Sequence, residues 1–140
     1  MSIISDETAA KHIFIILTQW NKAEAKFFLN SREGAGLHRN ILHNASARGY
    51  KNTVNLLLKS GLMDINATDY QDATALHLAC YNQYFEVVEI LIAHGAKIHK
   101  NLESFITPLI EELSMMGAQI YEELMDKIDD ENFDIVERYN

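Results

Sequence analysis

The sequence has little of three features that would indicate a disulfide-stapled, extended or membrane-spanning chain. It holds one cysteine, Cys80, which excludes a disulfide framework and makes a reducing compartment its natural setting. Its one proline, Pro108, fits a mostly helical chain. No apolar run approaches the roughly 20 residues of a membrane span. The apolar stretch 13–17 is short, and Asp6 and Glu7 precede it where a signal peptide carries positive charge.

Basic residues are scarce at the C-terminal end. The net charge is −8, and residues 111–140 hold ten acidic but only two basic side chains, whereas residues 1–110 hold ten of each. This imbalance argues against nucleic acid or an anionic membrane as a partner. A basic group nearer the front is interpreted as solvated surface rather than as a phosphate site. It consists of Arg32, Arg39, Arg48 and Lys51.

Motifs of catalysis and of metal binding are also missing. The sequence has neither a glycine-rich phosphate loop nor a Gly-x-Ser-x-Gly nucleophile motif. The pairs Glu111–Glu112 and Glu122–Glu123 are adjacent in sequence, so their carboxylates diverge on a helix and do not form one site. His77 and Cys80 lie three residues apart, but a zinc site needs two further ligands. We therefore expect no enzyme, no metal and no cofactor.

The most regular stretch of the chain runs from residue 69 to residue 99. Thr74 is a good N-cap for a short helix that begins with Ala75-Leu76-His77-Leu78-Ala79. A second helix is predicted from Phe85 to His94, and Gly95 ends it. Two short helices cannot bury their own apolar stripes, so the unit is expected to stack on neighbours.

The same pattern recurs 34 residues earlier. His43 corresponds to His77, Ala45 to Ala79 and Gly61 to Gly95, all at one offset. So many matches at one spacing indicate an internal repeat. Thr107-Pro108-Leu109 begins a third, more divergent copy, whose second helix is predicted over 118–128.

The N-terminal residues predict two more helices. Ser5 is placed to cap the first, and Asn21 with Glu24 resembles a capping box for the second, over 22–29. The apolar residues of the first helix recur at helical spacing and are expected to form a buried face. They are Ala9, Ile13, Ile16, Leu17 and Trp20.

These units resemble ankyrin repeats, in which Thr-Pro-Leu-His-x-Ala begins the first helix of each pair. The pattern stands here as Thr74-Ala75-Leu76-His77-Leu78-Ala79, with Asp72 replacing a hairpin glycine and Gln83 the glycine between helices. The resemblance implies an all-α ankyrin-repeat solenoid of stacked helix-turn-helix units with short hairpin loops. We expect a single domain over residues 1–140, divided into a degenerate N-terminal cap repeat (1–34), two repeats (35–67 and 68–101) and a degenerate C-terminal repeat with an acidic cap (102–140).

What the resemblance implies for function is a noncatalytic protein–protein interaction scaffold. Partners of such stacks usually meet the hairpin tips and the exposed, concave side of the first helices. Tyr70 and Tyr81 carry the rings best suited to an interface hot spot, although each ring could instead pack on a neighbouring repeat. The predicted partner-binding residues are Leu37, Arg39, Arg48, Tyr70, Gln71, Tyr81, Asn82, Ile106 and Met115.

Three further expectations complete the sequence-based interpretation. The loop around Asp64-Ile65-Asn66 resembles the ankyrin target of an asparaginyl hydroxylase, with Asn66 as the modified residue, although it is also ordinary repeat-loop sequence. An alternative function is a regulatory or inhibitory subunit that acts through the acidic tail, 126–137. The protein is expected to be a cytoplasmic monomer, in the host cytoplasm if its source is an intracellular microbe. The predicted partner is a protein, and the sequence does not indicate which one.

Overall fold

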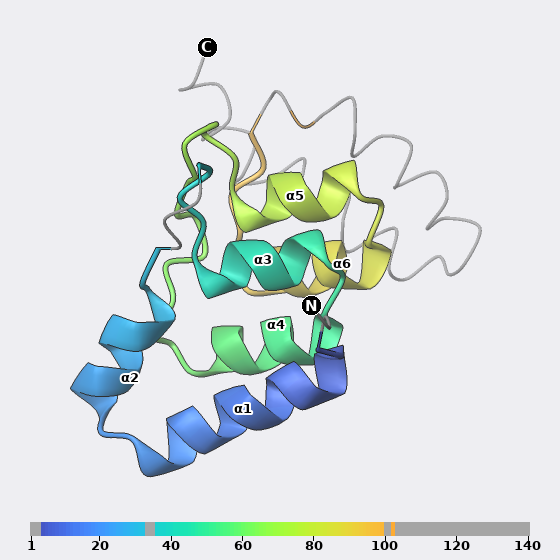
Figure 1. Ribbon diagram of the computed structural model, residues 1–140. Helices are drawn as coiled ribbons and strands as arrows, with labels where there is room; N and C mark the ends of the chain where they lie inside the picture. The colour runs from blue at the N-terminus through green and yellow to red at the C-terminus, as the bar shows by residue number, and fades with distance from the viewer. Residues whose placement is uncertain (1–3, 33–35, 100–101, 103–140) are drawn as a thin grey trace.

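The computed structural model describes residues 4–32, 36–99 and 102, and within them the chain is all-α. The six helices form three consecutive pairs (Figure 1). The helices are α1 (Asp6–Gln19), α2 (Lys22–Leu29), α3 (Ile41–Ala47), α4 (Lys51–Lys59), α5 (Ala75–Tyr81) and α6 (Phe85–Ala93). The all-α repeat fold expected from the sequence is therefore confirmed, while the helix predicted over 118–128 lies outside the described residues.

Side-chain caps begin four of the six helices, three of them at residues that the sequence indicated. Ser5, Asn21 and Thr74 accept backbone N–H groups at the starts of α1, α2 and α5. Asn40 does the same for α3. Because a side-chain oxygen satisfies one of the free donors of the first turn, these residues stop each helix from extending backwards into the loop.

The second and third pairs stack as two parallel rows. Helix α3 packs against α5, and α4 packs against α6, so that first helices lie beside first helices and second helices beside second helices. Their apolar stripes meet in one continuous core. Its fully buried large side chains are Leu42, Val54, Leu57, Leu76, Val87, Leu91, Ile92, Ile98 and Leu102, together with Ile13 and Leu29 from the first pair.

The first pair departs from this arrangement. Helix α1 packs chiefly against α4, and Figure 1 shows α4 lying between α1 and α3. Helix α1 therefore extends the row of second helices rather than the row of first helices. The end of α2 contacts the loop that follows α4, because the side-chain amide of Asn30 donates to the Leu62 carbonyl oxygen at 2.9 Å.

The unusual position of α1 corrects part of its expected buried face. Ile13 and Ile16 are buried, and Ala9 and Leu17 are half-buried, as expected. Trp20 is instead 41% exposed, and its ring meets the edge of Phe28 with centroids 5.2 Å apart. Trp20 follows the last residue of α1, where the chain turns into α2, so helical spacing no longer directs it toward the core.

Candidate functional site

The candidate site is a groove between the loop 69–74 and the exposed side of α5. Its volume is about 550 Å³. It is lined by Arg39, Gln71, Asp72, Ala73, His77, Leu78, Tyr81 and Asn82. These residues come from one hairpin loop, from the helix that follows it, and from the start of the preceding repeat.

Asp69 holds the loop beside the groove in shape. One of its carboxylate oxygens accepts the backbone N–H groups of Gln71 at 2.8 Å and Ala73 at 3.0 Å. The other accepts from Nε of Arg39 at 3.1 Å. Burial by itself raises the pKa of Asp69, but these N–H donors and the guanidinium outweigh it and hold the pKa below its ordinary value. The loop is thus tied to the preceding repeat by a charge-assisted contact.

Two buried histidines, His43 and His77, hydrogen-bond to backbone groups of the loops. His43 Nδ1 accepts the N–H of Asn40 at 3.0 Å, and its Nε2 donates to the Ala67 carbonyl oxygen at 2.7 Å. His77 Nδ1 accepts the N–H of Thr74 at 3.1 Å. Both histidines are buried and are held by backbone groups at a helix start, an arrangement that fits a structural rather than a catalytic role.

The neighbouring hairpin tips are joined to one another. The N–H of Tyr70 donates to the Leu37 carbonyl oxygen at 3.0 Å. The Tyr70 ring stacks on the ring of His38, with centroids 4.6 Å apart and planes within 6°. Tyr70 nevertheless remains 71% exposed, so it both packs on a neighbouring repeat and presents a large aromatic surface.

Four of the predicted partner-binding residues therefore line one groove: Arg39, Gln71, Tyr81 and Asn82. Tyr81 is 61% exposed there. The side-chain amide of Asn82 donates to the Ala47 carbonyl oxygen at 3.2 Å, which places the end of α5 beside the end of α3 and exposed Arg48.

Two predicted residues lie at the hairpins, and two lie outside the described residues. Tyr70 is on a hairpin tip, and half-buried Leu37 is on the tip before it. Ile106 and Met115 lie outside the part of the chain that the structure describes. The partner-binding residues predicted from the sequence did not include the other four lining residues, which are Asp72, Ala73, His77 and Leu78. The position of Asp72 in the hairpin turn was the available signal for its place at the rim.

The basic group near the front does not assemble into one site, because three of its members contact different partners. Arg32 Nη1 donates to the carbonyl oxygens of His38 and Thr68, and Arg39 pairs with Asp69. Lys51 Nζ lies 2.8 Å from a Glu86 carboxylate oxygen, which raises the pKa of this lysine. These contacts favour roles in holding loops and helices over a phosphate site.

Cys80 and Asn66 lie in structural positions. Cys80 is 2% exposed, and burial raises its pKa to about 12, so its thiol is neutral and shielded at physiological pH. The Asn66 side-chain oxygen accepts the N–H of Lys97 at 2.9 Å, which ties two successive loops together. Hydroxylation of Asn66 stays a prediction. A mass increase of one oxygen atom on the peptide that contains Asn66 would detect it.

The described residues hold no cluster of three or more His, Cys, Asp or Glu side chains arranged to bind a metal ion. No helix among them is both long enough and apolar enough to cross a membrane.

Comparison with known proteins agrees with the geometry. Residues 10–101 match the family model of ankyrin repeats in three copies. The chain is 42% identical over 59 residues to a probable E3 ubiquitin-protein ligase of Oryza sativa subsp. japonica, a match covering 42% of this chain and 12% of that protein. It is 42% identical over 55 residues to a palmitoyltransferase of Schizosaccharomyces pombe, a match covering 39% of this chain and 9% of that protein.

A third relative is named for its repeats. Ankyrin repeat domain-containing protein 49 of Bos taurus is 40% identical over 55 residues, covering 39% of this chain and 23% of that protein. The chain thus matches less than a quarter of each of these relatives, and no solved structure matches it significantly. Because the family model spans most of the chain, and the second and third helix pairs stack in two parallel rows, the chain belongs to the ankyrin-repeat family.

Proposed function

We propose that this chain is a noncatalytic scaffold that binds one protein partner through the groove beside α5 and the adjoining hairpin tips. Ankyrin repeats are generally protein–protein interaction modules. The observation that carries the proposal is the grouping of Arg39, Gln71, Tyr81 and Asn82 around one groove, next to the exposed ring of Tyr70. The enzymatic names of two relatives belong to proteins of which this chain matches about a tenth, so they do not bear on this chain.

Rigidity supports the proposal. The loop beside the groove is held by Asp69, and the hairpin tips by the Tyr70–Leu37 bond and the His38–Tyr70 stack. A surface that is ordered before binding loses little conformational entropy when a partner docks. Tyrosine rings suit such a surface because they offer a large contact area with few rotatable bonds.

The experiment is affinity capture from native lysate, followed by a binding measurement with the purified captured protein. Wild type is compared with a Tyr70→Ala/Tyr81→Ala variant whose fold is checked by circular dichroism. Lys59→Ala is the control, because Lys59 is exposed at the end of α4 and does not line the groove. We expect the double variant to weaken binding at least about tenfold and the control to leave it unchanged.

A partner that binds the folded double variant as tightly as wild type would refute the proposed groove. The same titration tests the alternative that the acidic tail, 126–137, binds the partner; the tail lies outside the described residues. Binding that survives the double variant, weakens steeply with salt and disappears on truncation after residue 125 would favour the tail.

A further inference from the structure

The groove beside α5 has one charged side chain whose charge is not balanced by a neighbour. Apart from its histidine, the charged residues of its lining are Arg39 and Asp72. Arg39 pairs with the buried carboxylate of Asp69, so these two charges cancel. Asp72 is exposed, and within the described part of the chain its carboxylate makes no hydrogen bond or ion pair. The groove therefore offers a single free negative charge at its rim.

Two other arginines of this region do not line the groove. Nη1 of Arg32 donates to two backbone carbonyl oxygens instead. Arg48 is exposed and follows the last residue of α3, beside the Asn82 end of α5. Asp72 precedes the opposite end of α5, and seven helical residues span about 10 Å, which is roughly one Debye length. Arg48 therefore does not neutralise Asp72.

The apolar part of the lining suits the stem of a long basic side chain. Ala73 and Leu78 contribute apolar surface to the groove, and the exposed ring of Tyr81 stands at the end of α5. Lysine and arginine pack their carbon stems along such a surface while they keep the charged head in water. A basic side chain of a partner can thus lie along the groove and reach the carboxylate at its rim.

The ring of Tyr70 adds a second attraction for a cation at this place. Tyr70 and Asp72 lie on one tight turn, which is closed by the bond from the Asp72 N–H to the Asp69 carbonyl oxygen at 3.1 Å. His38 covers one face of the Tyr70 ring, and the large exposure of Tyr70 leaves the other face open. An ammonium or guanidinium group over an open aromatic face gains a cation–π attraction.

Polar groups of the lining can bind the main chain of the same partner segment. The side-chain NH₂ of Asn82 donates to the carbonyl oxygens of Ala47 and Leu78, which leaves its side-chain oxygen as an acceptor. Within the described residues Arg39 uses only its Nε, which leaves its Nη groups as donors. Each residue of an extended peptide presents one N–H and one carbonyl oxygen, so these groups match its backbone.

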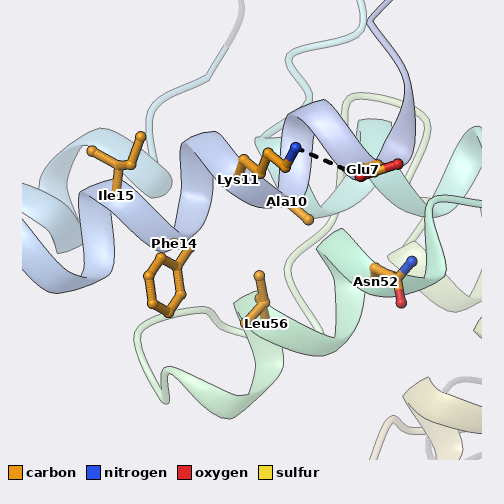
Figure 2. A pocket seen from close by; sticks show the side chains of 7 residues that line it. All are labelled: Glu7, Ala10, Lys11, Phe14, Ile15, Asn52 and Leu56. Atoms are coloured by element: carbon orange, nitrogen blue, oxygen red, sulfur yellow. Dashed lines mark ion pairs between the residues drawn. The ribbon is translucent and has the colours of Figure 1, made fainter.

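Another groove, between α1 and α4, lacks an unbalanced charge. On its rim Glu7 pairs with Lys11 at 3.5 Å, and Figure 2 shows Phe14 reaching from α1 to lie beside Leu56 of α4. The groove has a volume of about 460 Å³ and is lined by Glu7, Ala10, Lys11, Phe14, Ile15, Asn52 and Leu56. Because its two charges balance, charge selects no partner there, in contrast with the groove beside α5.

We propose that the groove beside α5 binds an extended segment of the protein partner that carries a lysine or arginine, with the charged head of that side chain at Asp72 and Tyr70 and its stem along the groove. This inference rests on the proposed function and names the chemistry of the partner. The net charge of −8 adds a long-range attraction for a basic partner.

Defined peptide pools test the proposal on the full 140-residue chain. Each pool contains immobilised peptides of about nine residues, which exceed the length of α5 when extended. The central residue is fixed as Lys, Arg, Leu or Glu, and the other positions vary among Ala, Ser, Val and Tyr. We expect the Lys or Arg pool to bind wild type at least about threefold more tightly than the Leu pool, and the Glu pool to bind most weakly. Asp72→Asn should remove this preference, and Asp72→Lys should reverse it.

Glu24→Lys is the matched control, because exposed Glu24 lies on α2, does not line the groove and undergoes the same change of charge as Asp72→Lys. It should leave the preference for basic pools unchanged. Circular dichroism checks the fold of every variant. Equal binding of all four pools, or binding of none, overturns the proposal, and the lysate capture with the tyrosine variant then decides the proposed function separately.

Two further outcomes separate this inference from the proposed function. A captured partner that is weakened by Tyr70→Ala/Tyr81→Ala but not by Asp72→Asn keeps the groove as the binding site and overturns the basic side chain. A preference for basic pools that survives Asp72→Lys also overturns the inference. If truncation after residue 125 then abolishes that preference, the acidic tail, 126–137, is what binds the basic peptides.

Discussion

Gly49 and Gln83 occupy the same place in successive repeats and take the same left-handed backbone conformation, with φ values of 72° and 59°. The turns around them have matching hydrogen bonds. Tyr50 N–H donates to the Ala45 carbonyl oxygen at 2.9 Å, and Tyr84 N–H donates to the Ala79 carbonyl oxygen at 3.0 Å. The turn between α5 and α6 therefore keeps its geometry although a glutamine replaces the glycine of the repeat pattern.

Gln83→Gly should stabilise the protein. A side chain in the left-handed region costs about 1–2 kcal/mol, and the greater freedom of glycine in the unfolded chain offsets part of that gain. We expect a net increase of about 0.5–1 kcal/mol in the free energy of unfolding by urea titration. A decrease would mean that the exposed glutamine side chain makes a stabilising contact of its own.

Gly49→Ala is the opposite test at the equivalent position. The added methyl group would lie 2.5 Å from Cδ1 of Tyr84, in addition to the left-handed strain. We expect a loss of about 2 kcal/mol or more, measured in the same titration. A loss below about 1 kcal/mol would show that the Tyr84 ring moves aside at little cost.

At the scale of the element, α4 begins without a capping side chain of its own. Tyr50 stands at its N-cap and makes no side-chain cap bond. The carboxylate of Asp6 on α1 takes this role instead. It accepts the N–H groups of Asn52 and Thr53 at 3.0 Å each, and the Thr53 hydroxyl at 2.7 Å. The Tyr50 hydroxyl in turn donates to the Ile4 carbonyl oxygen, so the starts of α1 and α4 are joined from both sides.

Asp6→Ala should therefore destabilise two helices through one residue. It removes a cap from α4 and a contact that holds α1 in place, and we expect a loss of about 1–2 kcal/mol in urea unfolding. Hydrogen exchange should show faster opening of α1 than of α5 and α6 in this variant. Glu24→Ala, in the exposed first turn of α2, is the control and should change stability by less than about 0.5 kcal/mol. Equal losses in the two variants would argue against a capping role.

The first helix of the second pair, α3, should make stability depend on pH through His43. Burial lowers the pKa of His43 below its ordinary value of 6.5, although the Ala67 carbonyl oxygen acts in the opposite direction. Burial, aided by His77 and Lys97, likewise lowers the pKa of His99. The unfolded chain therefore binds these protons more readily than the folded chain does. Stability should be complete above about pH 6.5 and should fall as the pH drops toward the folded pKa values.

The measurement is the urea midpoint between pH 7.5 and pH 5, together with the imidazole NMR signals of His43. We expect the midpoint to fall over this interval. Because the pKa of His43 is lowered from 6.5, its imidazole should be less than half protonated at pH 6.5. Protonation of Nδ1 would remove the acceptor for the Asn40 N–H, which is the structural reason for the effect. A midpoint that is flat or rises toward pH 5 would contradict the prediction.

At the scale of the whole molecule, Cys80 reports whether the stack is intact, because it lies inside the continuous core. Its pKa of about 12, against an ordinary 9.0, reduces the thiolate at pH 8 about a thousandfold. Iodoacetamide should therefore label the native protein at least about a thousandfold more slowly than the urea-unfolded chain. Mass spectrometry over time measures both rates. Fast labelling under native conditions would mean that α5 opens locally, and that this opening costs much less free energy than global unfolding.

Local structure could be predicted largely from the sequence. The caps at Ser5, Asn21 and Thr74 and the bounds of α2 follow from short-range chemistry, and the structure confirms them. Helix α6 ends at Ala93, with His94 as its C-cap, one residue before the predicted end. The groove residues could be predicted in part, because the family resemblance indicates which positions face outward. The pairing of Arg39 with Asp69 depends on the distance between two repeats, which the sequence does not give. The same is true of the four residues that complete the lining: Asp72, Ala73, His77 and Leu78.

The sequence by itself determined the repeat unit, because the 34-residue offset recurs in residues whose roles are local: helix caps, small core residues and left-handed turns. The tertiary structure alone decided where the first helix pair sits. The apolar stripe of α1 can cover either row of a stack, and periodicity does not choose between them. The Asp6 contacts with α4 are non-local hydrogen bonds over 46 and 47 residues, and they accompany α1 in the row of second helices. That placement leaves Phe14 of α1 57% exposed, on the groove between α1 and α4.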